Sequence, residues 1–164
     1  MVNQLKLVKE KLDALPESKH ALRLWLRMLT CSSMVEHRMR NMLKERFDTT
    51  LPRFDLMAAL YRVQDGLTMG ELSRWLMVSN GNVTGVAERL DKEGLITRTP
   101  SPTDRRTQMV ALTPKGREEF GKMAAYHEDW INNLFSDFSM EELDQMMGLL
   151  AKAKESIVKN SEEE

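Results

Sequence analysis

The sequence predicts a mainly α-helical fold that carries one small β-hairpin. Two observations lead to this fold class. Residues 67–94 are typical of two short helices separated by a tight turn, and residues 95–112 of two strands around a polar, proline-rich loop. Further apolar stripes at helical spacing lie toward both ends of the chain. Together these features predict a winged helix-turn-helix lobe (51–112), between N-terminal helices (1–50) and C-terminal helices (113–164).

Residues 1–50 are expected to form two helices. The first ends at Pro16, and the second runs from about Lys19 to Phe47. Apolar residues recur at helical spacing, broadly along one side of each helix. They are Leu5, Val8, Leu12 and Leu15 in the first helix, and Leu22, Trp25, Leu29, Cys31, Val35, Met39, Met42 and Leu43 in the second.

A third helix opens at Pro52, because proline is favoured in the first turn of a helix. Its apolar residues are Phe54, Met57, Ala58, Leu60 and Tyr61. The turn residues Gln64-Asp65-Gly66 end this helix. Leu67 is then expected to supply a minimal third strand beside the hairpin.

The helix-turn-helix follows. Thr68 can cap its first helix, in which Leu72, Trp75 and Leu76 share one face, and Val78-Ser79 makes the turn. Ser79 can cap the second helix. The buried stripe of that helix is predicted to be Val83, Val86, Ala87 and Leu90.

This stripe leaves small or neutral polar residues facing outward or sideways. They are Asn80, Gly81, Asn82, Thr84 and Gly85, with the acidic Glu88 beyond them. Such a surface can approach base edges closely without electrostatic repulsion, which is the geometry of a recognition helix. The two glycines each cost a helix interior about 1 kcal/mol, so a close approach to DNA would account for them.

Gly94 stands where a glycine would end the recognition helix. The strands Leu95–Thr99 and Gln108–Leu112 then enclose a loop that carries Arg105 and Arg106 at its tip. Guanidinium groups on a projecting wing can enter the minor groove or bind phosphate. Asp104 is expected to orient one of them through a charge-assisted hydrogen bond. The alternative is a surface hairpin whose arginines are only solvated.

Two further helices complete the chain. Thr113 and Pro114 start a helix that continues through Leu134, and Ser139 with Glu142 forms a capping box for the last one. The last helix has a narrow apolar seam, formed by Leu143, Met146, Leu150, Ala153 and Ile157. Pairing the terminal stripes of two subunits would bury them and set the distance between two recognition helices. The alternative is that both stripes fold back on their own core.

Several runs in this order resemble the MarR family of bacterial transcriptional regulators. They are Leu67–Ser73, Ser79–Leu95, Asp104-Arg105-Arg106 and Leu112-Thr113-Pro114-Lys115-Gly116. The resemblance covers roughly residues 18–158. It implies a dimeric winged-helix DNA-binding protein, usually a repressor, whose affinity for its operator falls when a small molecule binds or a thiol is oxidised.

The expected DNA-binding residues follow from this arrangement. Asn80, Asn82 and Thr84 are candidates for contacts to bases or adjacent phosphates, Arg74 for the DNA backbone, and Arg105 and Arg106 for the minor groove. The full predicted set is Arg74, Ser79, Asn80, Gly81, Asn82, Thr84, Asp104, Arg105 and Arg106. The predicted partners are a double-stranded operator and a second copy of the chain.

Net charge gives little support for a broad cationic surface. The whole chain carries −1, and residues 67–112 hold six basic against five acidic side chains. Binding must therefore depend on where the arginines are placed, and we expect a moderate dependence on salt. A single cysteine excludes an intrachain disulfide and suits a reducing compartment. No secretory signal or membrane-length apolar run is visible, so a cytoplasmic protein is expected.

The family resemblance also implies an effector pocket between the dimer helices and the winged lobe. Its expected lining is Trp25, Met28, Met34, His37, Met39, Arg40, Met57 and Tyr61. The alternative for each methionine is a place in the core. Arg27, Arg38 and Arg40 could hold an anionic effector, or could be solvated or ion-paired.

Two segments, Leu51–Met57 and Met77–Gly85, are similar to a branch of the family that controls aromatic-acid catabolism. Some members of that branch respond to hydroxycinnamoyl-CoA thioesters. The resemblance therefore suggests an aromatic carboxylate or its CoA thioester as the effector.

Other kinds of site have weaker support. Cys31 could sense oxidants, but no activating cluster surrounds it in the sequence, so a buried, inert thiol is favoured. His20, His37 and His127 are too far apart to predict a metal site. No phosphate-binding glycine loop or nucleophile elbow is present, so neither an enzyme nor a cofactor is expected. A winged helix used only for protein contacts is the remaining alternative, and it would tolerate Arg105→Ala and Arg106→Ala.

Overall fold

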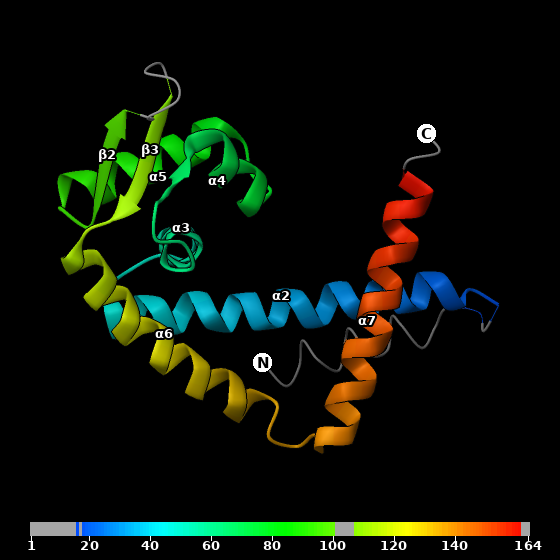
Figure 1. Ribbon diagram of the computed structural model, residues 1–164. Coiled ribbons are helices and arrows are strands. Elements are labelled where there is room, and N and C mark those ends of the chain that lie inside the picture. The colour runs from blue at the N-terminus through cyan, green and yellow to red at the C-terminus, as the bar shows by residue number, and fades with distance from the viewer. Residues whose placement is uncertain (1–15, 17, 101–106, 162–164) are drawn as a thin grey trace. The chain divides into compact units, whose positions relative to one another are not determined.

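The computed structural model describes residues 16, 18–100 and 107–161, and its helices and strands confirm the predicted fold class (Figure 1). The elements are α2 (His20–Phe47), α3 (Leu51–Tyr61), β1 (Leu67–Thr68), α4 (Met69–Leu76), α5 (Asn80–Lys92), β2 (Ile96–Pro100), β3 (Gln108–Leu112), α6 (Pro114–Leu134) and α7 (Met140–Ser161). The helix expected before Pro16 lies outside the described residues.

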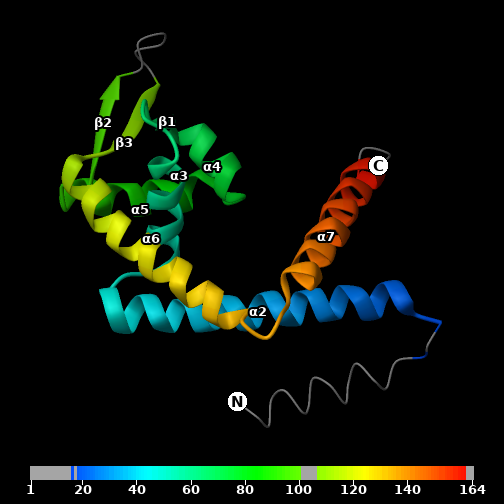
Figure 2. The ribbon, with the colours of Figure 1, turned by 60° about the horizontal axis from the view of Figure 1, so that its bottom comes forward.

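The chain forms two compact units, Met1–Phe120 and Gly121–Glu164, and α6 begins in the first and ends in the second. The first unit contains what we call the winged lobe, residues 51–112. Figures 1 and 2 show this lobe at the C-terminal end of α2. The three-part division at residues 50 and 112 stays a prediction.

The sheet is antiparallel, with strand order β1-β3-β2. Leu67 pairs with Val110, which confirms the minimal third strand. In the hairpin, Ile96 pairs with Leu112, and Pro100 pairs with Gln108. Strand β2 therefore begins one residue later than expected and ends on proline, which an edge strand tolerates.

The core of the first unit lies where the C-terminal end of α2, helices α3 to α5 and the sheet meet. Its largest fully buried side chains are Leu43, Leu56, Met57, Leu60, Leu72, Leu90, Ile96, Val83 and Val110. At its edge Phe120, at the end of the unit, packs on Phe54 and Tyr61 with ring centroids 5.2 and 5.0 Å apart. The aromatic contacts fix the start of α6 against α3.

Only the last turns of α2 take part in this core, where Met42 and Leu43 are buried. Farther toward the start of α2 the apolar side chains are uncovered in the single chain: Trp25 is 56% exposed, and Leu22 and Leu29 are exposed too. Cys31 is also exposed, which corrects the expectation of a buried thiol. The cause is the length of α2, since the packed lobe covers only one end of it (Figure 2).

A close contact joins the hairpin to α6. The Thr113 hydroxyl donates to the carbonyl of Gly94 at 2.8 Å and accepts from the N–H of Gly116 at 3.0 Å, confirming Thr113 as a cap. A Cβ atom on Gly116 would lie 1.9 Å from the carbonyl oxygen of Leu95. Glycine is therefore required at position 116, because the backbone of α6 approaches the backbone of Leu95 there.

In the second unit, the capping box at the start of α7 is confirmed. The Ser139 N–H donates to the Glu142 carboxylate at 2.8 Å, and the Glu142 N–H donates to the Ser139 hydroxyl at 3.2 Å. Hydrogen bonds from the Ser139 backbone N–H and hydroxyl lower the pKa of the Glu142 carboxyl. Helix α7 has no buried residue, and Met146, Leu150 and Ile157 of its seam are 39–61% exposed.

Candidate nucleic-acid interface and pocket

The first helix of the helix-turn-helix begins at a full capping box. The Glu71 N–H donates to the Thr68 hydroxyl at 3.2 Å, and the Thr68 N–H donates back to the Glu71 carboxylate at 2.8 Å. Bonds from the Thr68 backbone and hydroxyl lower the pKa of Glu71. Leu72 is fully buried, as predicted, but Trp75 is 50% exposed. The position of Trp75 on the apolar stripe was therefore misleading, because the neighbouring elements cover only part of this helix face.

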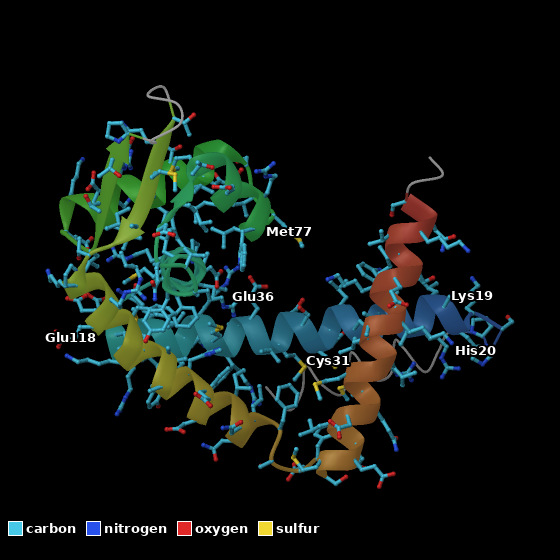
Figure 3. The ribbon with its side chains drawn as sticks, in the orientation of Figure 1. Lys19, His20, Cys31, Glu36, Met77 and Glu118 are labelled. Atoms are coloured by element: carbon cyan, nitrogen blue, oxygen red, sulfur yellow. The ribbon has the colours of Figure 1, made fainter. Side chains whose placement is uncertain are left out.

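The turn begins one residue earlier than predicted. Met77 adopts a left-handed conformation (φ 53°), and the Val78 N–H donates to the Ser73 carbonyl at 3.1 Å. The Met77 side chain is 93% exposed, and Figure 3 shows it projecting from the end of α4. A non-glycine residue in this conformation is uncommon, so the left-handed Met77 could not be predicted from its residue type.

Helix α5 has the predicted buried stripe. Val83, Ala87 and Leu90 are at most 2% exposed, whereas Val86, the fourth residue of the predicted stripe, is only half-buried. Ser79 is the N-cap residue, but its side chain makes no capping hydrogen bond, which corrects the assigned role of its hydroxyl. The Leu95 N–H donates to the Leu90 carbonyl at 2.9 Å, and Gly94 has φ +70°, so the helix ends at the expected glycine.

Helix α5 is open at its glycines. A Cβ atom on Gly81 or Gly85 would meet nothing within 4 Å. Asn82 is exposed, and Thr84 is half-buried. Contacts within the chain therefore do not require glycine at position 81 or 85. At Gly116, by contrast, the Leu95 carbonyl leaves no room for a side chain.

An ion pair fixes the C-terminal end of α5. The Arg53 guanidinium, from the start of α3, binds both carboxylate oxygens of Glu93, one of them at 2.6 Å. The Lys115 ammonium, from α6, donates to the Glu93 carbonyl at 3.1 Å. The hydrogen bonds from Arg53 lower the pKa of Glu93 and raise that of Arg53. Contacts at Glu93 therefore link α3, α5 and α6.

A pocket of about 510 Å³ lies between α2, α3, the turn after α4, and α5. Most of its wall is apolar, and four charged side chains and one amide interrupt it. Its lining residues are Glu36, Arg40, Leu51, Pro52, Asp55, Leu56, Leu76, Val78, Gly81, Asn82, Val83, Gly85, Val86 and Arg89. Figure 3 shows Glu36 on the side of α2 that faces the winged lobe. Helix α5 therefore forms one wall of the pocket.

Asp55 is the unusual charge in this lining. Burial, and secondly the nearby charge of Glu36, raise its pKa to about 6, while Arg40 acts in the opposite direction. Glu36 itself forms an ion pair with Arg40, one turn away on α2. Asp55 makes no hydrogen bond or ion pair with any residue that the structure describes.

Comparisons with known proteins fit this geometry. A MarR family profile matches residues 47–107, from the end of α2 into the wing. The transcriptional activatory protein BadR of Rhodopseudomonas palustris is 30% identical over 139 residues, which cover 80% of this chain and 77% of BadR. The chain belongs to the MarR family.

Other MarR-type proteins agree. YkoM of Bacillus subtilis, named as an uncharacterized HTH-type transcriptional regulator, is 32% identical over 121 residues, covering 74% of this chain and 77% of YkoM. The structure of S. aureus MepR in complex with DNA superimposes with a TM-score of 0.69 and 26% identity over 77% of this chain and 96% of MepR. This MarR-family chain is therefore a DNA-binding transcriptional regulator and not an enzyme.

The structure places the predicted DNA-binding residues of this MarR-family protein on the helix-turn-helix or outside the described residues. Arg74 is exposed on α4, Ser79 precedes α5, and Asn80 begins it. The three predicted wing residues, Asp104, Arg105 and Arg106, lie outside the described residues. Arg98, which the sequence did not single out, lies in β2 with its Nε 3.6 Å from the Asp91 carboxylate, and is only 22% exposed.

Of the predicted effector-binding residues, only Arg40 lines the pocket described above. Met57 is 1% exposed in the core, and Tyr61 packs on Phe120 beneath the guanidinium of Arg117. Trp25 is exposed on α2. The remaining residues of the predicted lining, Met28, Met34, His37 and Met39, lie on α2 but do not line this pocket.

The sequence reasoning missed Glu36, Asp55 and Arg89. A usable signal was present for Asp55, a charged residue between Phe54 and Leu56 in an otherwise apolar helix. No helix among the described residues has the length and apolar character needed to cross a membrane. In the same part of the chain, no three acidic, histidine or cysteine side chains lie close enough together to hold a metal ion.

Proposed function

We propose that this MarR-family protein is a ligand-responsive homodimer that represses transcription by occupying a pseudo-palindromic operator. The observation that carries this proposal is the shared position of α5: its open face holds Gly81 and Asn82, and the same residues line a pocket large enough for a small molecule. A ligand in that pocket would contact the recognition helix.

Dimerisation is supported by the apolar residues that each unit leaves exposed. In the first unit, Leu22, Trp25 and Leu29 lie along the uncovered part of α2. In the second unit, Leu150 and Ile157 do the same on α7. Exposed apolar stripes of this length are typical of surfaces that pair with another helix. Analytical ultracentrifugation should give a dimer at micromolar concentration, and a strict monomer would contradict the proposal.

We further propose that the two α5 helices enter successive major grooves, about 34 Å apart along the duplex. Asn80, Asn82 and Thr84 would contact bases or adjacent phosphates. Ser79 and Gly81 would allow close approach, and Arg74 would bind the DNA backbone. The wing residues Arg105 and Arg106 would reach the minor groove, with Asp104 as the partner of one of them.

The wing provides the most direct test. Arg106→Ala should weaken operator binding by about 1–3 kcal/mol without changing the fold, as measured by a gel-shift titration on the promoter beside the protein's own gene. Lys152→Ala removes an exposed cation from α7 and should leave the affinity unchanged. Equal affinities for both variants would exclude the wing from DNA recognition.

The direction of regulation is tested with a reporter gene. Deleting the regulator should raise expression from its promoter if it represses. Because BadR is named as an activatory protein, the opposite result has a precedent among relatives. A fall in expression on deletion would replace repression with activation and leave DNA binding intact.

For the effector, we propose a small molecule with an aromatic or similarly flat apolar body. The finer sequence prediction, an aromatic carboxylate or its CoA thioester acting in aromatic catabolism, stays a prediction. A thermal-shift screen should include aromatic acids, their CoA thioesters and oxidants, followed by a test of DNA release for each hit. A ligand that stabilises the protein and releases the operator is the expected result.

The exposed thiol of Cys31 favours a second candidate, a redox-sensing regulator. Peroxide should then release the operator from the wild-type protein but not from Cys31→Ser. If both proteins keep the operator after peroxide treatment, the thiol has no regulatory role.

A further inference from the structure

The pocket beside α5 has a distinctive distribution of charge. The Glu36 carboxylate is neutralised by Arg40 on the same helix. Arg89, the other cation in the lining, is exposed and lies more than 4.0 Å from any carboxylate oxygen of Asp55. Among the described residues, Asp55 therefore lines the pocket without a direct ion-pair or hydrogen-bond partner, although it is half-buried.

The surroundings of Asp55 explain why ionisation of its carboxyl is unfavourable. Leu56 beside it on α3 is fully buried, and Leu51 and Pro52 one turn earlier are apolar. A carboxylate in such a place loses much of its hydration without gaining a donor. Apolar side chains from the other walls, Leu76 and Val86 among them, give a ligand a surface to pack against.

We propose that this pocket binds an organic cation with a flat apolar body, whose N–H groups donate to the Asp55 carboxylate. The proposal rests on the proposed ligand response and names its chemical class. A bare aromatic carboxylate would instead bring a third negative charge beside Glu36 and Asp55. Arg40 is already paired, and Arg89, the other cation of the lining, is exposed to solvent. The apolar walls bind the ligand body, and the charge-assisted hydrogen bond gives specificity.

The site would act on DNA binding locally. Gly81, Asn82 and Gly85 belong both to the pocket and to the open face of α5. A ligand that contacts these residues changes the surface and mobility of the recognition helix itself. No movement has to be transmitted from a distant site.

Protonation supports the assignment. The pKa of Asp55 is near 6, and the charged groups that face it from the pocket walls are Glu36 and Arg40 on α2 and Arg89 on α5. Above this pH the carboxylate is ionised and attracts a cation. Below it the carboxyl is neutral, and the attraction is lost.

The experiment compares two probes of equal size, benzamidine and benzoate, which are cationic and anionic at both pH 5 and pH 8. Isothermal titration with the full-length protein should show that benzamidine binds at least about tenfold more tightly than benzoate at pH 8. This preference should shrink severalfold at pH 5. In Asp55→Asn, which keeps the size of the side chain, it should be absent at both pH values.

A second measurement locates the probe. Methyl NMR signals of Val78, Val83 and Val86 should shift when benzamidine is added. Benzoate binding as tightly as benzamidine, no binding of either probe at millimolar concentration, or shifts confined to methyl groups outside the pocket would each overturn the proposal. If Asp55→Asn does not fold, the pH dependence of the wild-type preference decides alone.

DNA release is measured separately by gel shift in the presence of benzamidine. Release supports both the ligand class and the proposed ligand response. Specific binding at Asp55 without release would support the ligand class and contradict the proposed response. The two proposals can therefore fail independently.

Discussion

Gly85→Ala should make the protein more stable and a poorer DNA binder. Gly85 lies inside α5, where alanine is favoured over glycine by about 0.5–1 kcal/mol. The added methyl group would meet no atom within 4 Å, so no clash subtracts from this gain. Chemical denaturation at fixed protein concentration should therefore show the free energy of unfolding increased by that amount.

Operator affinity should move in the opposite direction. If the open face of α5 comes against DNA, the methyl group occupies space that the duplex needs, and a loss of about tenfold is expected, similar to the cost of overpacking a close contact. Gly148→Ala is the matched control, because Gly148 also lies inside a helix, α7, with nothing within 4 Å. It should gain the same stability and keep full affinity.

Two results would refute this reasoning. Full operator affinity in Gly85→Ala would show that the glycine is not kept for approach to DNA. A loss of stability would show that the local space around Gly85 is not open. A gel-shift titration and a denaturation curve on the same samples separate the two.

Three other predictions concern stability. Gly116→Ala should destabilise the fold by about 3 kcal/mol or more in urea denaturation, because its Cβ would lie 1.9 Å from the Leu95 carbonyl oxygen; a loss below about 1 kcal/mol would contradict this contact. A double-mutant cycle of Arg53→Met and Glu93→Gln should give a coupling of about 1 kcal/mol at pH 7, since the side chains are 21% and 45% exposed. The lowered pKa of Glu93 means that this coupling is present above pH 4.5 and is lost as the pH falls through the folded-state pKa, so a constant coupling would be contrary evidence. Asp55→Asn should stabilise the protein at pH 8 by about 1 kcal/mol, after allowance for partial exposure, because the raised pKa near 6 destabilises the native state increasingly from pH 4 to 6 and fully above. At pH 4 the two proteins should be equally stable, and equal stability at pH 8 would show that Asp55 carries no such penalty.

The sequence was sufficient for most helix and strand boundaries. Thr113 and Ser139 mark helix starts because a hydroxyl at the N-cap satisfies backbone N–H groups locally, and Gly94 marks an end because only a residue tolerant of positive φ fits there. These signals act within a few residues of the chain. The two-residue strand at Leu67 was also predictable, from its place after a glycine turn.

Burial was harder to predict, because it depends on which elements cover a helix. Trp75 and Cys31 both lie on apolar helix faces, yet their neighbours in the fold leave them exposed. The pocket was the least predictable feature. Glu36, Asp55 and Arg89 come from three helices, and no spacing in the sequence indicates that they meet.

The joint at Gly94, Leu95, Thr113 and Gly116 has a mechanical consequence. It connects the end of α5, the start of the hairpin and the first turn of α6 through the Thr113 backbone and hydroxyl. At Gly116 the backbone of α6 lies directly against the Leu95 carbonyl, with no side chain between them. A rotation of the first turn of α6 must therefore turn the wing root and the recognition helix together. In the proposed dimer, α5 and the wing would then bind or leave each proposed half-site together.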